Sequence, residues 1–263
     1  MTKSRIDAVL ADRGLFPSRS AAAGAVRAGE VRIGQDGPVA LRPSQLVAAD
    51  QSLIVDEGPR YVSRGGIKLE NALETLGVDV SSRECLDVGA STGGFTDCLL
   101  QRGASRVAAV DVAYGQLDLR MREDPRVDVI ERRNARDLQP SDLPFVPFLA
   151  VVDVSFISLT KILPAVARCL SSAGELLAMV KPQFELGKDR VGRGVVRDPA
   201  DRREAILVVA EAARGLGLSI RGFASSGLPG PKGNRETFIW CGGAGPAVED
   251  LEAAVAAAVE EDK

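Results

Sequence analysis

The chain is 263 residues long, which is enough for one large domain or for an α/β domain with a small module. Apolar residues make up 45% of it and charged residues 26%, as in an ordinary soluble globular protein, and the formal net charge is −3. It contains no histidine, which excludes reactions that need an imidazole base, and no apolar run of the roughly 18 residues that a membrane span requires.

The first part of the chain predicts a compact unit of about 55 residues that contains helices and short strands. Apolar residues at helical spacing are followed by Gly14 and Gly29, which end helices. The expected elements are helices over 4–13 and Ala21–Arg27 and strands over Val31–Ile33, Val39–Leu41 and Ser52–Val55. We therefore predict a small α+β domain over residues 1–57 and a linker over 58–63.

The rest of the chain alternates apolar strands with amphipathic helices, which predicts an α/β domain over 64–263 with a Rossmann-like, largely parallel sheet. The expected strands are Glu84–Val88, Arg106–Asp111, Val127–Ile130, Phe148–Asp153, Glu175–Val180, Ser219–Ser225 and Thr237–Cys241. The expected helices are Gly66–Leu76, Gly94–Arg102, Leu117–Arg122, Leu159–Leu170, Pro199–Leu216 and Ala247–Glu261.

A run of small residues follows the first strand of this domain and lets a ligand approach the backbone closely. The run and its flanks are Gly89, Ala90, Ser91, Thr92, Gly93, Gly94 and Phe95. A hydrolase nucleophile elbow fits G-x-S-x-G, but its serine needs a histidine base that the chain lacks. A dinucleotide site fits poorly, because the spacing is not G-x-G-x-x-G. The third interpretation is a site for S-adenosylmethionine.

Asp111 supports the third interpretation, because it ends the next strand. A carboxylate at that position can accept both hydroxyls of a cofactor ribose, although acidic residues also end strands for structural reasons. Asn134 and Ala135 follow the third strand and are expected near the adenine. Together with the glycine loop, Asp111 favours S-adenosylmethionine over a nicotinamide cofactor.

Charged side chains end two further strands. Asp153 closes the fourth strand and Lys181 closes the fifth. The carboxyl ends of strands line the ligand crevice in open α/β sheets, so both side chains are expected to face the cofactor. A solvated lysine in a turn is the competing interpretation of Lys181, but this lysine emerges directly from the apolar run Leu176–Val180. The sequence therefore places an amine and a carboxylate at a reaction centre.

With Lys68 and Glu236, these two residues form a set that resembles the tetrad of the FtsJ-like RNA ribose 2′-O-methyltransferases. The resemblance implies a class-I methyltransferase fold of seven strands, S-adenosyl-L-methionine as methyl donor and the four residues as catalytic. Lys181 is then the general base for a ribose hydroxyl, while Asp153 and Glu236 orient the two amines.

Longer segments are similar to the TlyA family, and the similarity spans nearly the whole chain. They are Ser63–Leu69, Leu86–Thr96, Asp153–Leu159, Val180–Glu185 and Gly230–Glu236. The family implies methylation of cytidine 2′-hydroxyls in ribosomal RNA of one or both subunits, and the complete first helix and C-terminal extension resemble the subtype acting on both. Actinobacterial members carry Arg-x-Trp-Val at the interdomain junction, where this chain has Pro59-Arg60-Tyr61-Val62.

The N-terminal unit resembles an S4-type RNA-binding module, although a small basic helical unit alone is also typical of a generic interaction module. The resemblance lies in Arg5–Asp7, Gly14-Leu15, Ser18-Arg19, Ala22 and Gly29–Ile33. It implies phosphate contacts by Arg5, Arg19 and Arg42, and Arg64 and Lys188 are RNA-binding candidates in the larger domain. The acidic tail from Glu249 carries six acids and one base, so the other residues carry +2.

The remaining expectations concern compartment and alternatives. No apolar segment follows the charged start, so we expect no signal peptide, a cytoplasmic location and no stable membrane insertion. Four widely spaced cysteines and no histidine predict reduced, mostly buried thiols and no metal site: Cys85, Cys98, Cys169 and Cys241. Two alternatives stay open, a membrane-active haemolysin, as some family members are called, and a non-catalytic RNA-binding factor for ribosome assembly.

Overall fold

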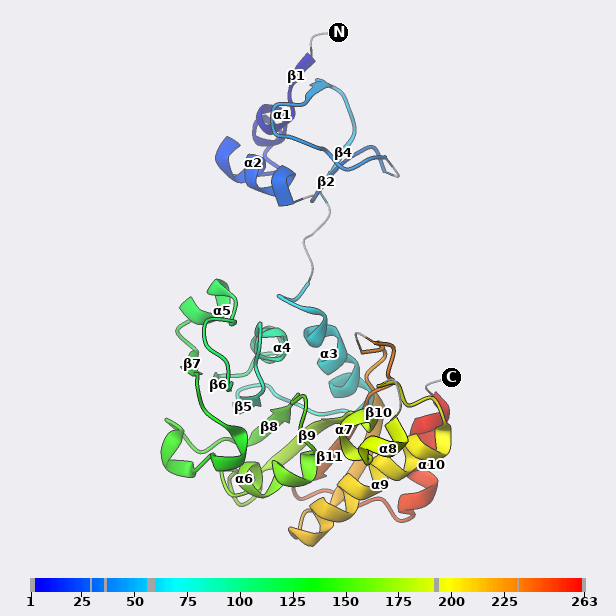
Figure 1. Ribbon diagram of the computed structural model, residues 1–263. Coiled ribbons are helices and arrows are strands. Elements are labelled where there is room, and N and C mark those ends of the chain that lie inside the picture. The colour runs from blue at the N-terminus through cyan, green and yellow to red at the C-terminus, as the bar shows by residue number, and fades with distance from the viewer. Residues whose placement is uncertain are drawn as a thin grey trace. The chain divides into compact units, whose positions relative to one another are not determined.

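The structure is a computed structural model that describes residues 3–28, 30–35, 37–55, 60–191, 194–230 and 232–261, without the side chains at 28, 188 and 189. The chain divides into two compact units, Met1–Arg60 and Tyr61–Lys263 (Figure 1). The predicted linker over 58–63 lies partly outside the described residues, because 58 and 59 are not among them.

Among the described residues of the smaller unit, two helices share a core with two antiparallel strand pairs. Helix α1 covers Ile6–Asp12 and α2 covers Arg19–Ala28. The strand pairs are β1 (Lys3–Arg5) with β3 (Leu46–Ala48) and β2 (Val31–Ile33) with β4 (Leu53–Val55). The helices bury apolar residues three and four positions apart, and these include Ile6, Val9, Leu10, Ala22, Ala25 and Val26.

A seven-stranded sheet in the order β10-β11-β9-β8-β5-β6-β7 forms the larger unit. Its strands are β5 (Glu84–Val88), β6 (Arg106–Val110), β7 (Val127–Ile130), β8 (Leu149–Val152), β9 (Glu175–Val180), β10 (Ile220–Ser225) and β11 (Thr237–Gly242). Strands β5 to β9 pair in parallel, whereas β11 runs antiparallel to both of its neighbours. The order reverses beside β5, which makes the carboxyl ends of β5 and β8 the expected position of a ligand crevice.

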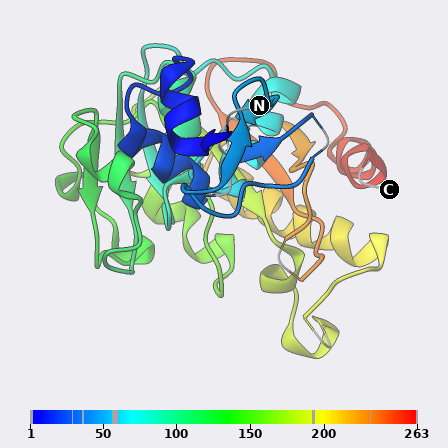
Figure 2. The same ribbon diagram turned by 90° about the horizontal axis from the view of Figure 1, so that it is seen from above.

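Helices cover both faces of this sheet, because successive strand residues point to opposite sides. The first face packs against α3 (Arg64–Leu76), α4 (Gly94–Gln101) and α5 (Leu119–Glu123). The second face packs against α6 (Leu163–Ala167), α9 (Pro199–Gly215) and α10 (Leu251–Glu261). Short helices α7 (Pro182–Glu185) and α8 (Lys188–Val191) follow β9, and the yellow-green segment around them projects from this unit in Figure 2. The predicted α/β class-I fold is confirmed.

Two predictions for the smaller unit are wrong. Strand β1, over Lys3–Arg5, precedes the helix, so the helix begins at Ile6 rather than at residue 4. The predicted strand Val39–Leu41 is reduced to one bridge between Val39 and Arg32, and the pairing strand is β3 instead. Strand β3 exposes Leu46 and buries only Val47, so no apolar alternation marks it as a strand in the sequence.

Two helices of the larger unit differ from prediction. The helix expected over Leu159–Leu170 is a 3₁₀ turn, Leu159–Lys161, followed by α6. Pro164 has no N–H and therefore belongs in a first helical turn, so the helix restarts beside it. Helix α10 begins at Leu251 rather than Ala247, because the Asp250 carboxylate accepts the Ala253 N–H at 3.0 Å and caps it there.

Candidate active site

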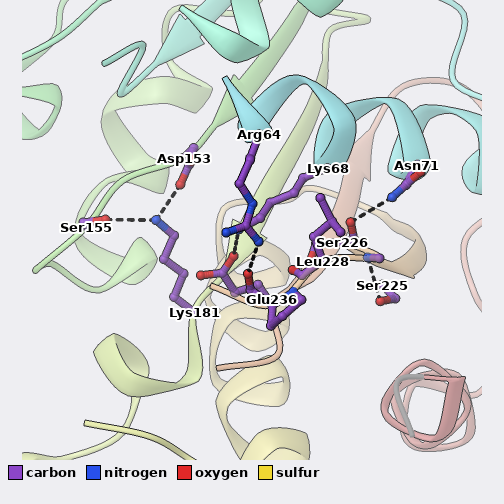
Figure 3. Close-up of polar contacts among 12 residues, drawn as sticks. Arg64, Lys68, Asn71, Asp153, Ser155, Lys181, Ser225, Ser226, Leu228 and Glu236 are labelled. Atoms are coloured by element: carbon purple, nitrogen blue, oxygen red, sulfur yellow. Dashed lines mark hydrogen bonds and ion pairs between the residues drawn. The ribbon is translucent and has the colours of Figure 1, made fainter. Parts of the chain in front are cut away.

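Four charged side chains converge at the carboxyl ends of the central strands. Asp153 and Lys181 directly follow β8 and β9, Lys68 comes from α3, and Glu236 immediately precedes β11 (Figure 3). All four line one cavity of about 530 Å³ that also borders the glycine loop. The structure therefore brings together the four residues predicted to form one site.

Lys68 and Glu236 form a buried ion pair. The Lys68 Nζ donates a hydrogen bond to Glu236 Oε2, and the two side chains are only 9% and 2% exposed. Asn71 supports the pair from the same helix, since its Nδ2 donates to the Ser226 carbonyl at 3.1 Å and so ties α3 to the loop between β10 and β11. Helix α3 and this loop consequently fix Lys68 and Glu236 in one place.

Lys181 contacts a carboxylate and a hydroxyl on the loop after β8. Its Nζ lies 2.5 Å from Asp153 Oδ1 in an ion pair and donates a hydrogen bond to Ser155 Oγ at 2.9 Å. The lysine side chain is 10% exposed, whereas Asp153 is 26% exposed. Lys181 is therefore held inside the cavity with its amine group against the loop that follows β8.

Two neighbouring cavities extend the first one, which we call the glycine-loop cavity. The Asp111 cavity, of about 480 Å³, is lined by Asp111, Asn134 and Ala135 together with Gly89 and Ser91. The aromatic cavity, of about 300 Å³, lies on the other side of Lys181 and contains Phe156 and Phe184, whose ring centroids are 5.3 Å apart. The three cavities share residues and form a continuous cleft.

Glycine is required at two positions of the loop. Gly89 has φ +88°, and a Cβ there would lie 2.3 Å from the Asp153 carbonyl oxygen, so the ends of β5 and β8 approach closely only without a side chain. Gly93 has φ +94°, and its Cβ would lie 2.9 Å from Leu117 and Met121. Gly93 is not among the residues that line the cavities, unlike the other predicted loop residues, Gly89, Ala90, Ser91, Thr92, Gly94 and Phe95.

Asp111 holds the glycine loop in addition to lining its cavity. Its Oδ2 accepts the Ser91 N–H and its Oδ1 accepts the Ala113 N–H, both at 2.7 Å. Each carboxylate oxygen keeps a second lone pair that can accept a ligand hydroxyl. Asn134 caps the 3₁₀ helix that follows it by accepting the Arg136 N–H at 3.1 Å.

Asp87 lies completely buried, two residues before Gly89. Its Oδ2 accepts the Thr96 hydroxyl at 2.7 Å, while Oδ1 accepts no hydrogen bond from the described part of the chain. Burial raises the pKa of Asp87 to about 7, against the opposing effect of the Thr96 hydrogen bond. Asp87 is not among the predicted site residues, although a carboxylate within an apolar strand is a recognisable signal.

The predicted RNA-binding residues lie in three places. Arg64 lines the glycine-loop cavity and donates to the Pro229 carbonyl at 3.0 Å, whereas the side chain of Lys188 lies outside the described residues. In the smaller unit, Arg5 forms two hydrogen bonds with Asp7, at 2.8 and 3.1 Å, and Arg19 lies 3.6 Å from the same carboxylate. Arg42 is exposed.

Ser155 and Glu185 connect the two loops of the site and are not among the predicted site residues. Glu185 accepts the Ser158 hydroxyl at 2.5 Å and the Leu159 N–H at 2.9 Å, and thereby joins the segment after Lys181 to the segment after Asp153. Burial raises the pKa of this carboxyl, although both hydrogen bonds oppose the rise. Both residues lie within the family-like segments Asp153–Leu159 and Val180–Glu185, but no pattern distinguished them there.

Comparison with known proteins decides the family. The model of the FtsJ-like methyltransferases matches residues 61–243. The chain belongs to the FtsJ-like methyltransferase family. Within it, this methyltransferase is 49% identical to the 16S/23S rRNA (cytidine-2′-O)-methyltransferase TlyA of Mycobacterium tuberculosis, over 90% of this chain and 89% of that protein.

Other relatives of this methyltransferase carry a different name. It is 36% identical to Hemolysin A of Brachyspira hyodysenteriae over 88% of this chain and 97% of that protein. A solved structure from Streptococcus thermophilus, also named for haemolysin, has a TM-score of 0.75 and 38% identity, and covers 99% of this chain and 96% of its own. Among the described residues, no helix of this methyltransferase has the length and apolar character needed to cross a membrane.

Proposed function

We propose that this protein uses S-adenosyl-L-methionine to methylate the ribose 2′-hydroxyl of cytidine in ribosomal RNA. The observation that carries the proposal is Lys181, whose amine lies between Asp153 and Ser155 in the cavity that reaches the glycine loop. Relatives whose names specify this reaction, including a 23S rRNA (cytidine-2′-O)-methyltransferase TlyA from Campylobacter jejuni, support the substrate class.

The residues of the cleft fit the cofactor. Gly89 lines both the glycine-loop cavity and the Asp111 cavity with backbone alone, and Asp111 presents carboxylate oxygens to the second of them. Asn134 and Ala135 line the same cavity and would lie beside the adenine. When bound, S-adenosylmethionine supplies a methyl group on a sulfonium sulfur, whose C–S bond breaks with the electron pair remaining on sulfur.

Lys181 is the general base of the proposed reaction. To act as a base, Lys181 must first release a proton to solvent; its Nζ then takes the proton of the substrate hydroxyl, whose oxygen would accept the methyl group. Asp153 orients this amine from 2.5 Å and balances the charge it acquires. Positioned proton transfer of this kind contributes typically 10²–10⁴-fold to a rate.

Lys68 and Glu236 have a supporting role in the proposal. The ion pair holds a cation and an anion against the reaction centre without adding net charge to it, because each neutralises the other. Arg64 at the cavity and the arginines of the smaller unit are the proposed contacts to RNA phosphates, with the smaller unit acting as an S4-type module. Lys188 is a further proposed contact.

Transfer of tritiated methyl groups to separated small and large ribosomal subunits, followed by nuclease mapping of the label, tests this function. The wild-type protein is expected to label cytidine 2′-oxygens. Lys181→Met is expected to lower the single-turnover rate about 10²–10⁴-fold and to keep cofactor binding by calorimetry. Lys161→Met, which changes an exposed lysine of the Leu159–Lys161 turn, is the matched control and should retain the rate.

Two outcomes would contradict the proposal. A wild-type protein that binds the cofactor and labels neither subunit excludes ribosomal RNA as substrate. A Lys181→Met protein with normal turnover removes Lys181 as the base.

A further inference from the structure

Ser155 lies where the three parts of the cleft meet. It lines the glycine-loop cavity, the Asp111 cavity and the aromatic cavity, and its hydroxyl contacts the amine of Lys181 (Figure 3). Ser155 therefore borders the space beside the glycine loop, the space beside Asp111 and the space beside the two phenylalanine rings.

The contacts of the Lys181 amine leave one of the tetrahedral bonding directions of its nitrogen for a lone pair. A neutral lysine amine is tetrahedral, with one bond to carbon, two N–H bonds and a lone pair. The nitrogen donates a hydrogen bond to Ser155 Oγ at 2.9 Å, whereas its contact with Asp153 Oδ1 at 2.5 Å is an ion pair without hydrogen-bond geometry. The hydrogen bond to Ser155 fixes the rotation of the amine about its Cε–Nζ bond, and the Asp153 carboxylate attracts the second N–H, so the lone pair takes the third tetrahedral position. With Asp153 alone, the amine could rotate about its Cε–Nζ bond.

The backbone around Ser155 is held in a strained form. Phe156, the next residue, has φ +65°, a left-handed conformation that costs a bulky side chain of order 1–3 kcal/mol. Glu185 secures the same loop from the Lys181 side through its bonds to Ser158 and Leu159. Such strain persists only where surrounding contacts over-determine the conformation. Here the bonds of Glu185 hold the loop in this conformation and so fix the position of Ser155 beside Lys181.

We propose that Ser155 is a positioning residue that directs the lone pair of Lys181 toward the substrate hydroxyl. This inference rests on the proposed function, in which Lys181 is the base. Ser155 takes up no proton in the net reaction, since the hydroxyl proton of the substrate ends on the Lys181 Nζ and Ser155 remains a hydroxyl.

Two substitutions at Ser155 test the proposal. Ser155→Ala removes the acceptor and is tolerated by the fold, because the residue is exposed in the cleft. Ser155→Thr keeps a hydroxyl. Ser141→Ala, at an exposed serine away from the three cavities, is the matched control. The measurements are single-turnover methylation of ribosomal subunits from pH 5.5 to pH 9.5, and cofactor affinity by calorimetry.

Ser155→Ala is expected to lower the plateau rate by about 10–100-fold, because the lone pair of a misdirected base no longer points at the proton of the substrate hydroxyl. The cofactor affinity is expected to change less than about twofold. The acidic limb of the pH profile should also move to lower pH, since loss of an acceptor disfavours the charged amine. Ser155→Thr should restore most of the rate and the position of the limb. A general structural defect would lower the rate at every pH without shifting the acidic limb of the pH profile.

The proposal is overturned if Ser155→Ala stays within about fivefold of the wild type, if threonine does not restore the rate, or if the limb stays in place. A wild-type protein that is inactive on both subunits would refute the proposed function instead. The two failures are therefore distinguishable.

Discussion

Lys68 and Glu236 are 168 positions apart in sequence, and their side chains meet in an ion pair that is almost completely removed from solvent. Removing two charges from water is unfavourable, and their attraction offsets this only while both partners are present. The pair therefore links α3 to the start of β11, but the loss of either residue leaves the other as a buried charge without a partner.

We expect Glu236→Gln to lower the free energy of unfolding by about 3–5 kcal/mol, because it leaves Lys68 as a buried charge without its partner. Urea denaturation followed by circular dichroism measures this. The double variant Lys68→Met with Glu236→Leu should recover most of the stability and none of the methylation activity. Equal stability of the single variant and the wild type would show that the pair is solvated in solution.

A second prediction concerns the contact between Gly89 and the end of β8. Gly89→Ala places a Cβ 2.3 Å from the Asp153 carbonyl oxygen at φ +88°, so the backbone must shift. We expect a loss of about 3 kcal/mol or more in unfolding free energy and a clear loss of cofactor affinity. The control is Gly187→Ala, where nothing lies within 4 Å of the added Cβ, and which should stay within about 0.5 kcal/mol.

The four charged residues of the site differ in how well the sequence alone could predict them. Asp153 and Lys181 were predictable, because each ends an apolar strand and the carboxyl ends of parallel strands lie together. Lys68 and Glu236 come from a helix and from a loop before an antiparallel strand. The rule that the carboxyl ends of parallel strands lie together does not apply to those segments, so the prediction of Lys68 and Glu236 depended on resemblance to a family. The alternation of strands and helices likewise predicted all seven strands of the sheet with errors of one or two residues at their ends.

Other features could not be read from the sequence. Ser155 and Glu185 act through a hydrogen bond of 2.9 Å to Lys181 and bonds to the Ser158 segment, and only folding shows that these segments are adjacent. Strand β3 buries only Val47 and exposes Leu46, so it has no periodic apolar signal. Local chemistry can nonetheless override periodicity, as Pro164 does where it divides the helix expected over Leu159–Leu170.

The third prediction is a pH dependence of stability that is due to Asp87. Its folded-state pKa of about 7 exceeds the ordinary aspartate value of 3.8, so the native state holds this proton more tightly than the unfolded chain does. The contribution of Asp87 to stability is therefore largest at low pH and falls as pH rises from about 4 to about 7. At 1.36 kcal/mol per pKa unit, the fall amounts to at most about 4 kcal/mol.

Asp87→Asn removes this titration and keeps an acceptor for the Thr96 hydroxyl. Urea denaturation at several pH values between 5 and 8 should show the unfolding free energy of the wild type declining relative to that of the variant. Parallel curves for the two proteins would show that Asp87 does not titrate in this range.

The last prediction concerns RNA binding by Arg42, an exposed residue of the smaller unit. Each phosphate contact releases a condensed cation, so the logarithm of the binding constant falls linearly with the logarithm of salt concentration. If Arg42 contacts a phosphate, Arg42→Gln should reduce the magnitude of that slope by about 0.7–0.9. Filter binding of ribosomal RNA between 50 and 200 mM salt measures the slope.

Arg214→Gln provides the matched control, because Arg214 is also exposed but is paired with Glu211 at the end of α9, away from the cleft. Its slope should equal that of the wild type. Arg5 is a less direct probe than Arg42, since Arg5→Gln also removes the partner of Asp7, whose side chain is 6% exposed and whose pKa Arg5 lowers through hydrogen bonds. Arg5→Gln should therefore lower stability at neutral pH as well as the salt slope. An unchanged slope for Arg42→Gln would place the RNA on a different face of this unit.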